Sequence, residues 1–215
     1  MAANRPSTSS SPERLTPAPV PLGTGAGGRR QSHDPPERSG GPSSAGPAPA
    51  DPLAAFLADL RARLAPAVVP GFDPLDGGAG ARVLVLLEKP GPGALASGLV
   101  SRDNDSLTSR AIRSFLEEAG LPRRETVLWN VVPGWNGTMQ VKGAELREGL
   151  EHLARLLPLL PRLDTAILAG RHAGRAAPLL GELRLIATAH PSPNVRAAFP
   201  DRWAAIPGAW AEARR

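Results

Sequence analysis

Apolar and polar positions divide the chain into strands and helices that alternate. Four short runs are almost continuously apolar, which is typical of strands buried on both faces of a parallel sheet. The longer segments between them repeat large apolar residues at helical spacing. The predicted strands are 82–87, 126–131, 164–169 and 183–189. This alternation predicts an α/β fold of three layers (α/β/α), with a four-stranded parallel sheet between helices.

The predicted helices have recognisable starts and ends. Asp51-Pro52 supplies an N-cap and a first-turn proline for a helix whose apolar stripe extends to Leu64. Gly120 ends the helix that follows the first strand. The proline- and glycine-containing turn at 70–74 predicts a loop over 66–80. The other helices are expected at 146–157, at 172–180 and from about 201 to the end, with an interruption near Pro207.

The first fifty residues differ in composition from the rest. Residues 1–50 are rich in Pro, Gly, Ser and Ala and have almost no large apolar side chains. Such a segment cannot bury enough surface to offset its ordering entropy. We therefore expect a disordered tail at 1–50 and one domain at 51–215. The tail has a small excess of arginine over acids, which would allow weak contact with nucleic acid, but we expect it to be passive.

Composition excludes several kinds of chemistry. The chain has no cysteine, so disulfides, thiolate metal sites, iron–sulfur clusters and cysteine nucleophiles are excluded. His152 and His172 have no metal-binding partner at helical spacing, and no metal or cofactor is predicted. No apolar run reaches membrane-spanning length, and the start lacks a secretory segment. We expect a monomeric, cytoplasmic protein that contacts no membrane. The formal charge of +5 suits phosphate contacts and simple solubility equally.

Polar residues stand at the carboxyl ends of all four predicted strands: Glu88, Asn130, Arg171 and His190. The carboxyl ends of parallel strands meet at one edge of a sheet, where ligands bind. The carboxamide of Asn130 offers one acceptor and two donors, which match the imide edge of uracil, although it could instead fix the next loop. Glu88 could act as a general base or orient one, or it could pair with Lys89.

Two proline-containing turns follow these strands. The prolines of His190-Pro-Ser-Pro193 favour a stiff, extended loop, which can hold an imidazole against a ligand or serve as a plain rigid turn. Gly91–Ala96 formally fits a dinucleotide-binding pattern. A proline inside that turn argues against it, as does the lack of a second strand ending in an acid. A nucleotide-binding Rossmann-like enzyme is therefore only a third hypothesis.

Three segments resemble motifs of the uracil-DNA glycosylase superfamily. Leu87-Glu-Lys-Pro-Gly91 resembles its first motif, Leu128–Val132 its base-reading strand and His190–Pro193 its second motif. The similarity extends from about Arg82 to Trp203. The resemblance implies a monofunctional DNA repair enzyme that flips uracil, or a related deaminated base, out of DNA and hydrolyses its N-glycosidic bond without a cofactor. The alternative is a non-catalytic nucleic-acid-binding member of the same fold.

The resemblance also implies roles for single residues. His190 would stabilise the departing base, and Asn130 would read its Watson–Crick edge. Ser192 would contact DNA phosphate, and we add Arg171 and Arg196 as further phosphate ligands because arginine suits that role.

The chain departs from the family pattern at the catalytic carboxylate. Lys89 stands where the best-known branch has its water-activating aspartate. Glu88 or Asp103 must take that role, or no residue does. Because Lys89 adjoins Glu88, we expect the lysine to stay protonated, which prevents it from attacking a sugar carbon as a nucleophile.

The chain also departs from the family pattern around the base. Gly91 stands where the strict uracil branch has a tyrosine that blocks the methyl group of thymine, so a wider range of lesions is possible. Leu99 and Val100 occupy the expected place of the aromatic residue that stacks on the base. Trp135 is a candidate substitute, unless it only anchors its own loop.

Overall fold

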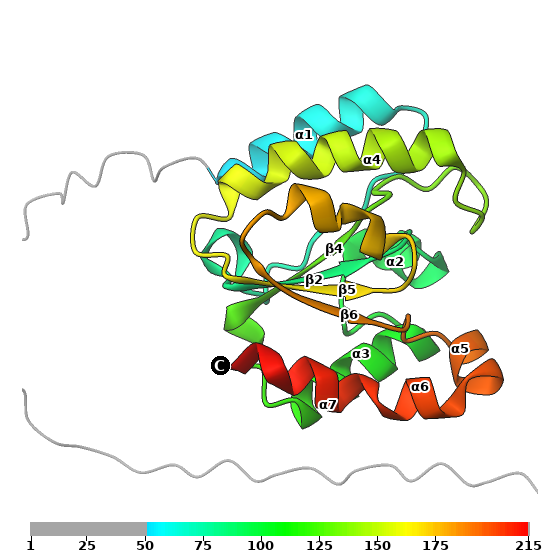
Figure 1. Ribbon diagram of the computed structural model, residues 1–215. Coiled ribbons are helices and arrows are strands. Elements are labelled where there is room, and N and C mark those ends of the chain that lie inside the picture. The colour runs from blue at the N-terminus through cyan, green and yellow to red at the C-terminus, as the bar shows by residue number, and fades with distance from the viewer. Residues whose placement is uncertain (1–50, 215) are drawn as a thin grey trace, which may run out of the picture. The chain divides into compact units, whose positions relative to one another are not determined.

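The computed structural model describes residues 51–214, so the predicted tail at 1–50 lies outside the described residues. A four-stranded parallel sheet in the order β4-β2-β5-β6 forms its centre. The strands are β2 (Val83–Leu87), β4 (Thr126–Asn130), β5 (Thr165–Ala169) and β6 (Arg184–Thr188). Helices cover both faces of the sheet (Figure 1). The predicted three-layer α/β fold is confirmed.

The helices form one layer above and one layer below the sheet in Figure 1. The upper layer contains α1 (Pro52–Leu64), α4 (Gly143–Leu156) and the 3-10 segment η4 (Ala173–Leu179). The lower layer contains α3 (Leu107–Glu118), α5 (Pro193–Ala198), α6 (Pro200–Ala204) and α7 (Ile206–Trp210). The remaining elements are α2 (Pro92–Ser97), the strands β1 (Gly71–Phe72) and β3 (Leu99–Val100), and the 3-10 turns η1 (Gly78–Gly80), η2 (Arg123–Glu125), η3 (Leu157–Leu159) and η5 (Ala211–Arg214).

The central strands explain why their sequences are continuously apolar. Every residue of β2, β4 and β5 is buried, because helices cover both faces of the sheet. Full burial of one large aliphatic side chain contributes about 1.5–3 kcal/mol. The register pairs Leu87 of β2 with Asn130 of β4. Glu88, which follows Leu87, therefore leaves the sheet beside Asn130 at the carboxyl edge.

The prediction that the last strand is buried is wrong. β6 is one of the two edge strands and pairs only with β5. Leu185 is 38% exposed, and Ala187 is also exposed. The other edge strand, β4, is fully buried, and Phe72 of β1 packs on it. An apolar run shows that a segment is a strand, but it does not show which other elements cover that strand. The exposed side of β6 contributes to a pocket that is described below.

Short elements differ most from the prediction. The expected loop at 66–80 contains β1, which pairs in parallel with β3. The expected helix at 172–180 is the 3-10 segment η4, with Pro178 inside it. The expected interruption near Pro207 is confirmed, because α6 ends at Ala204 and α7 begins at Ile206, with Pro207 in its first turn. A proline fits there because the first-turn N–H groups of a helix have no intrahelical partner.

Two close contacts fix β4 and the loop that follows it. The ring of Trp129 stacks on Phe72 of β1, with 4.2 Å between ring centroids. Helix α4 approaches the backbone after β4 at Gly149. A Cβ atom added at Gly149 would lie 2.0 Å from the carbonyl oxygen of Val131, so only glycine permits this approach. Asn130 is thus held between a packed aromatic pair and a tightly docked helix.

Candidate active site

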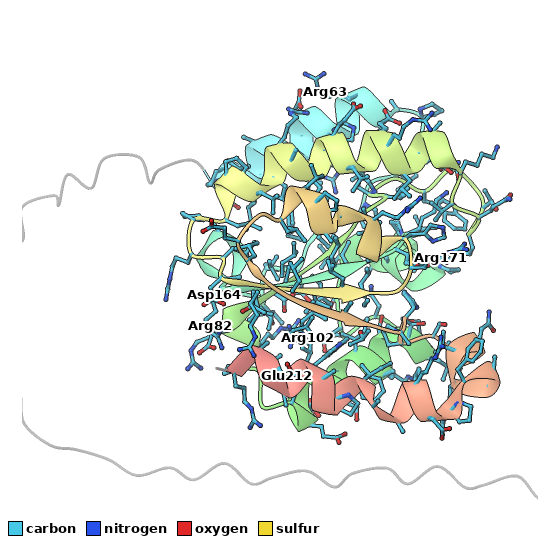
Figure 2. All side chains as sticks on the ribbon, in the orientation of Figure 1. Arg63, Arg82, Arg102, Asp164, Arg171 and Glu212 are labelled. Atoms are coloured by element: carbon cyan, nitrogen blue, oxygen red, sulfur yellow. The ribbon has the colours of Figure 1, made fainter. Side chains whose placement is uncertain are left out.

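The carboxyl ends of the strands bring Glu88, Asn130, Arg171 and His190 to one edge of the sheet, as expected. Glu88 directly follows β2, and Asn130 is the last residue of β4. Arg171 and His190 each lie two residues beyond their strands. Figure 2 shows Arg171 at this carboxyl edge, whereas Arg82 lies at the opposite, amino edge.

Two pockets lie on either side of His190, which lines both. We call the smaller one, of about 170 Å³, the inner pocket. It is walled by the loop after β2, the start of α3 and the end of β4. We call the larger one, of about 750 Å³, the outer pocket, and it lies along the edge strand β6. Glu88, Arg171 and Ser192 line the outer pocket, and Asn130 lines the inner one.

The side chain of Asn130 is buried but has no hydrogen-bond partner within residues 51–214. It is 3% exposed and lines the inner pocket. Its carboxamide forms no hydrogen bond with any other residue in the described part of the chain, although buried polar groups are usually paired. The donors and the acceptor of the amide are therefore available to a ligand. No hydrogen bond within residues 51–214 fixes which way the amide is turned.

His190 lies in the stiff loop that the sequence predicts. The N–H of Ser192 donates to the His190 carbonyl at 2.8 Å, and the Ser192 hydroxyl accepts from the N–H of Val195 at 3.4 Å, which caps α5. Burial lowers the pKa of His190 below its ordinary value of 6.5, and the charge of Glu88 opposes this shift without cancelling it. Near pH 7 the imidazole is therefore neutral, with one N–H to donate.

The start of α3 also faces the inner pocket. Ser106 caps this helix by accepting from the N–H of Ser109 at 3.0 Å. Ser106, Thr108 and Ser109 all line the inner pocket. The first turn of a helix has unpaired N–H groups and carries the positive end of the helix dipole. Negative charge that develops in the inner pocket is therefore stabilised by α3.

Lys89 is a structural cation, and the expected pairing of Lys89 with Glu88 is wrong. The Lys89 ammonium donates to Asn136 Oδ1 at 2.8 Å, to Glu145 Oε1 at 2.8 Å and to the Gln140 carbonyl at 3.2 Å. Its side chain is 1% exposed. These bonds tie the loop after β4 to the start of α4. The carboxylate partner of Lys89 is Glu145 and not Glu88.

Glu88 turns toward the loop after β5. Its Oε1 accepts from the backbone N–H of His172 at 2.9 Å and lies 3.3 Å from His172 Nδ1. Gly170 makes this possible, because a Cβ atom there would lie 2.6 Å from the same oxygen, and its φ of +105° disfavours other residues. Glu88 lines the outer pocket and not the inner one.

The structure does not bring Asp103 to either pocket. Its carboxylate pairs with Arg123 at 2.5 Å and with Arg113 at 3.5 Å. Arg123 directly precedes β4, so Asp103 is held toward the amino edge of the sheet. The next residue, Asn104, lines the inner pocket instead, and it donates to the Leu99 carbonyl at 2.9 Å. Within residues 51–214, no carboxylate lines the inner pocket.

Leu99 and Trp135 also lie outside the inner pocket. Leu99 belongs to β3, and the backbone of Trp135 forms an antiparallel bridge with Val68. Trp135 therefore anchors its loop, which was the alternative for this residue. Val100, which was expected at the same place as Leu99, lines the inner pocket, and so does Met139. Met139 is 57% exposed, and its flexible thioether can pack against a ring. No sequence signal marks this methionine.

The three expected phosphate ligands have different surroundings. Arg171 and Ser192 line the outer pocket. Arg196 is exposed on α5 and lines neither pocket, and its guanidinium lies 5.9 Å from the ring centroid of Trp203. Arg202 was not selected from the sequence, yet it lines the outer pocket. In the described part of the chain, no helix is long and apolar enough to cross a membrane, and no three potential metal ligands cluster.

Comparison with known families identifies the fold. The family model of the Uracil DNA glycosylase superfamily matches residues 74–214. The chain belongs to this superfamily. The match includes both pockets' polar residues and confirms the resemblance inferred from the three motifs. The three segments that resemble superfamily motifs, 87–91, 128–132 and 190–193, all contribute residues to the inner pocket.

One solved structure gives a more distant comparison. The solution NMR structure of a "putative Uracil DNA glycosylase" from Methanosarcina acetivorans aligns with a TM-score of 0.42 at 18% sequence identity. The alignment covers 66% of this chain and 94% of that chain. No curated protein matches the chain.

Proposed function

We propose that the protein is a DNA glycosylase that flips uracil, or a related deaminated base, into the inner pocket and hydrolyses its N-glycosidic bond. The observation that carries this proposal is Asn130, a buried carboxamide that has no hydrogen-bond partner among residues 51–214 and shares the inner pocket with His190. A cavity of roughly 150 Å³ accommodates benzene. The inner pocket, at about 170 Å³, therefore suits one pyrimidine ring.

The chemistry depends on stabilising the departing base. The bond between the sugar and the base breaks with both electrons staying on the base, which leaves as an anion. The neutral His190 donates its N–H to this anion, and the positive end of α3 lowers its energy further. The sugar becomes an oxocarbenium ion, to which a water molecule adds before releasing a proton. Because this cation is a strong electrophile, water needs little activation, which agrees with an inner pocket lined by no carboxylate in residues 51–214.

The second candidate is a non-catalytic nucleic-acid-binding protein. The observation that favours it is the same lack of a carboxylate in the described lining of the inner pocket, where Lys89 is committed to structural contacts. This protein would bind a flipped base through Asn130 without cleaving it.

A single-turnover excision assay separates the two functions. The substrates are single- and double-stranded oligonucleotides that contain uracil, hypoxanthine or xanthine. The wild-type protein should release at least one of these bases. His190→Ala should lower the rate about a hundredfold or more while changing DNA affinity little. Leu185→Ala, which alters an exposed position of β6 that lines neither pocket, is the matched control.

Two outcomes would count against the proposal. Binding of the flipped base without any release by the wild-type protein would favour the non-catalytic function. Wild-type rates in His190→Ala, combined with much weaker DNA binding, would show that His190 acts in binding rather than on the departing base.

A further inference from the structure

The outer pocket has no role in the proposed reaction, although it is the larger of the two. Its volume of about 750 Å³ lies within the usual range of ligand sites, roughly 300–1,000 Å³. It runs along the exposed edge of β6, between η4 on one side and α5 to α7 on the other. The inner pocket takes one base, so the outer pocket has room for a further nucleotide.

The floor of the outer pocket suits the flat face of a base. It is built from small and apolar side chains, among them Leu168, Ala187 and Ile206. Phe199 stands at its lining and is 52% exposed, an unusual state for a large aromatic side chain. The Arg202 guanidinium lies 5.2 Å from the centroid of this ring. Aromatic rings and arginine planes are the surfaces on which proteins stack unpaired bases.

The polar groups of the outer pocket match the two ends of a nucleotide. Arg171, Arg202 and the hydroxyl of Ser192 are donors suited to phosphate. Glu88 is the one carboxylate among the lining residues described. Its Oε1 accepts from His172, whereas its Oε2 forms no hydrogen bond with any of residues 51–214. That oxygen can accept a hydrogen bond from an amino group on a base.

We propose that the outer pocket binds the unstacked base of the nucleotide adjacent to the excised one. This inference rests on the proposed function, because it takes the target nucleotide to be the one that is turned toward the inner pocket. His190 separates the two pockets, so neighbouring nucleotides straddle the loop from His190 to Ser192. Glu88 accepts from the exocyclic amino group of cytosine, adenine or guanine, which thymine lacks. Glu88 is then a residue that determines sequence context rather than one that activates water.

The geometry also makes single-stranded DNA the better substrate. A base that enters the outer pocket must leave its own stack and its pairing partner, as the target base does. Unstacking costs least where the DNA is already single-stranded. Contacts to flanking nucleotides are a known source of context preference in enzymes that act on flipped bases.

Binding to uncleavable DNA tests the inference without relying on excision. Single-stranded oligonucleotides carry a tetrahydrofuran abasic analogue at the target position and each of the four bases on its 5′ or 3′ side. Thymine on one of the two sides should weaken binding by about tenfold relative to the other three bases at that position. This factor is the equivalent of one lost base contact. Glu88→Gln should abolish this difference, because a carboxamide can pair with thymine O4 as well as with an amino group.

Two further variants test whether the pocket itself is the binding site. Ala187→Trp fills the outer pocket from the exposed side of β6, and Phe199→Ala removes its stacking surface. Both changes are at exposed positions, and both should weaken binding to all four flanking bases. Leu185→Ala on the same strand should bind as the wild type does.

Equal affinity for all four bases on both sides would overturn the inference. Wild-type affinity in folded Ala187→Trp and Phe199→Ala would do the same. The results separate this inference from the proposed function. Excision without any flanking preference keeps the glycosylase and removes the second subsite. Flanking preference on abasic DNA without release of any base keeps the subsite and removes the glycosylase.

Discussion

Replacing Asn130 separates recognition of the base from stability of the fold. Asn130→Leu keeps the size of the side chain and removes a carboxamide that is 3% exposed and forms no hydrogen bond with residues 51–214. No protein hydrogen bond is lost, so the free energy of unfolding should change by less than about 1 kcal/mol. A large loss of excision in this variant would therefore report on the base and not on folding.

The size of the loss follows from the two groups of uracil that lose their partners. Without the carboxamide, N3–H and O4 of uracil are buried unpaired, at about 1–3 kcal/mol each. The total of about 2–6 kcal/mol corresponds to a rate loss of roughly thirtyfold to twenty-five-thousandfold. Asn130→Asp supplies an acceptor for an amino group, so it should depress uracil excision strongly and raise cytosine excision to a detectable level.

The assay is single-turnover excision of uracil and cytosine by the three proteins, with thermal unfolding as the folding check. Because no hydrogen bond within the described chain fixes the orientation of the Asn130 amide, a half-turn would present cytosine with a matching pattern. The wild type should therefore discriminate against cytosine by less than the 10⁴-fold or more typical of locked polar sites. If folded Asn130→Leu removes uracil at the wild-type rate, Asn130 is only a structural residue and the inner pocket is not the base site.

Three further changes probe Gly91, Gly170 and the ion pair between Lys89 and Glu145. A Cβ atom at Gly91 meets nothing within 4 Å, so Gly91→Tyr should fold and lower excision of 5-substituted uracils roughly tenfold or more relative to uracil. Gly170→Ala should lower the free energy of unfolding, measured in urea, by about 1–3 kcal/mol. The control Gly137→Ala should lower it less, because Gly137 has a φ of +95° but open space around it. Equal losses would refute the predicted clash with Glu88. Burial would raise the pKa of Glu145, but hydrogen bonds from a buried lysine and a backbone N–H outweigh it and lower the pKa below 4.5. That stabilisation is present above pH 4.5 and lost as pH falls through the folded pKa, so the melting temperatures of wild type and Glu145→Gln should converge in acid.

The sequence predicts the centre of the fold well because the centre is buried on both faces. In β2, β4 and β5 each position contacts a helix or a neighbouring strand, so nearly every position is apolar and the pattern is unambiguous. The end of each run marks the carboxyl edge, which is why Glu88, Asn130, Arg171 and His190 could be placed together. The pattern does not show which elements cover each strand, so the partly exposed strand β6 was wrongly predicted to be buried.

Side-chain direction is the part that pattern could not supply. Asp103 and Asn104 are consecutive, yet one pairs with Arg123 toward the amino edge and the other lines the inner pocket. The two residues lie in a turn, where neighbouring side chains diverge without a fixed period. Lys89 forms an ion pair with Glu145 of α4, a residue far away in the sequence. Such pairings depend on how helices and loops pack, and no local periodicity reports them.

The two sides of His190 carry charge of opposite sign, and each side suits a different role. On the inner side lies the positive end of α3, which suits an anion. Burial lowers the pKa of His190, so its imidazole is neutral near pH 7. On the outer side lies Glu88, whose negative charge opposes that shift. A carboxylate in the inner pocket would repel the departing base as its charge develops. Because Glu88 instead lies on the outer side of His190, the inner pocket can stabilise that base.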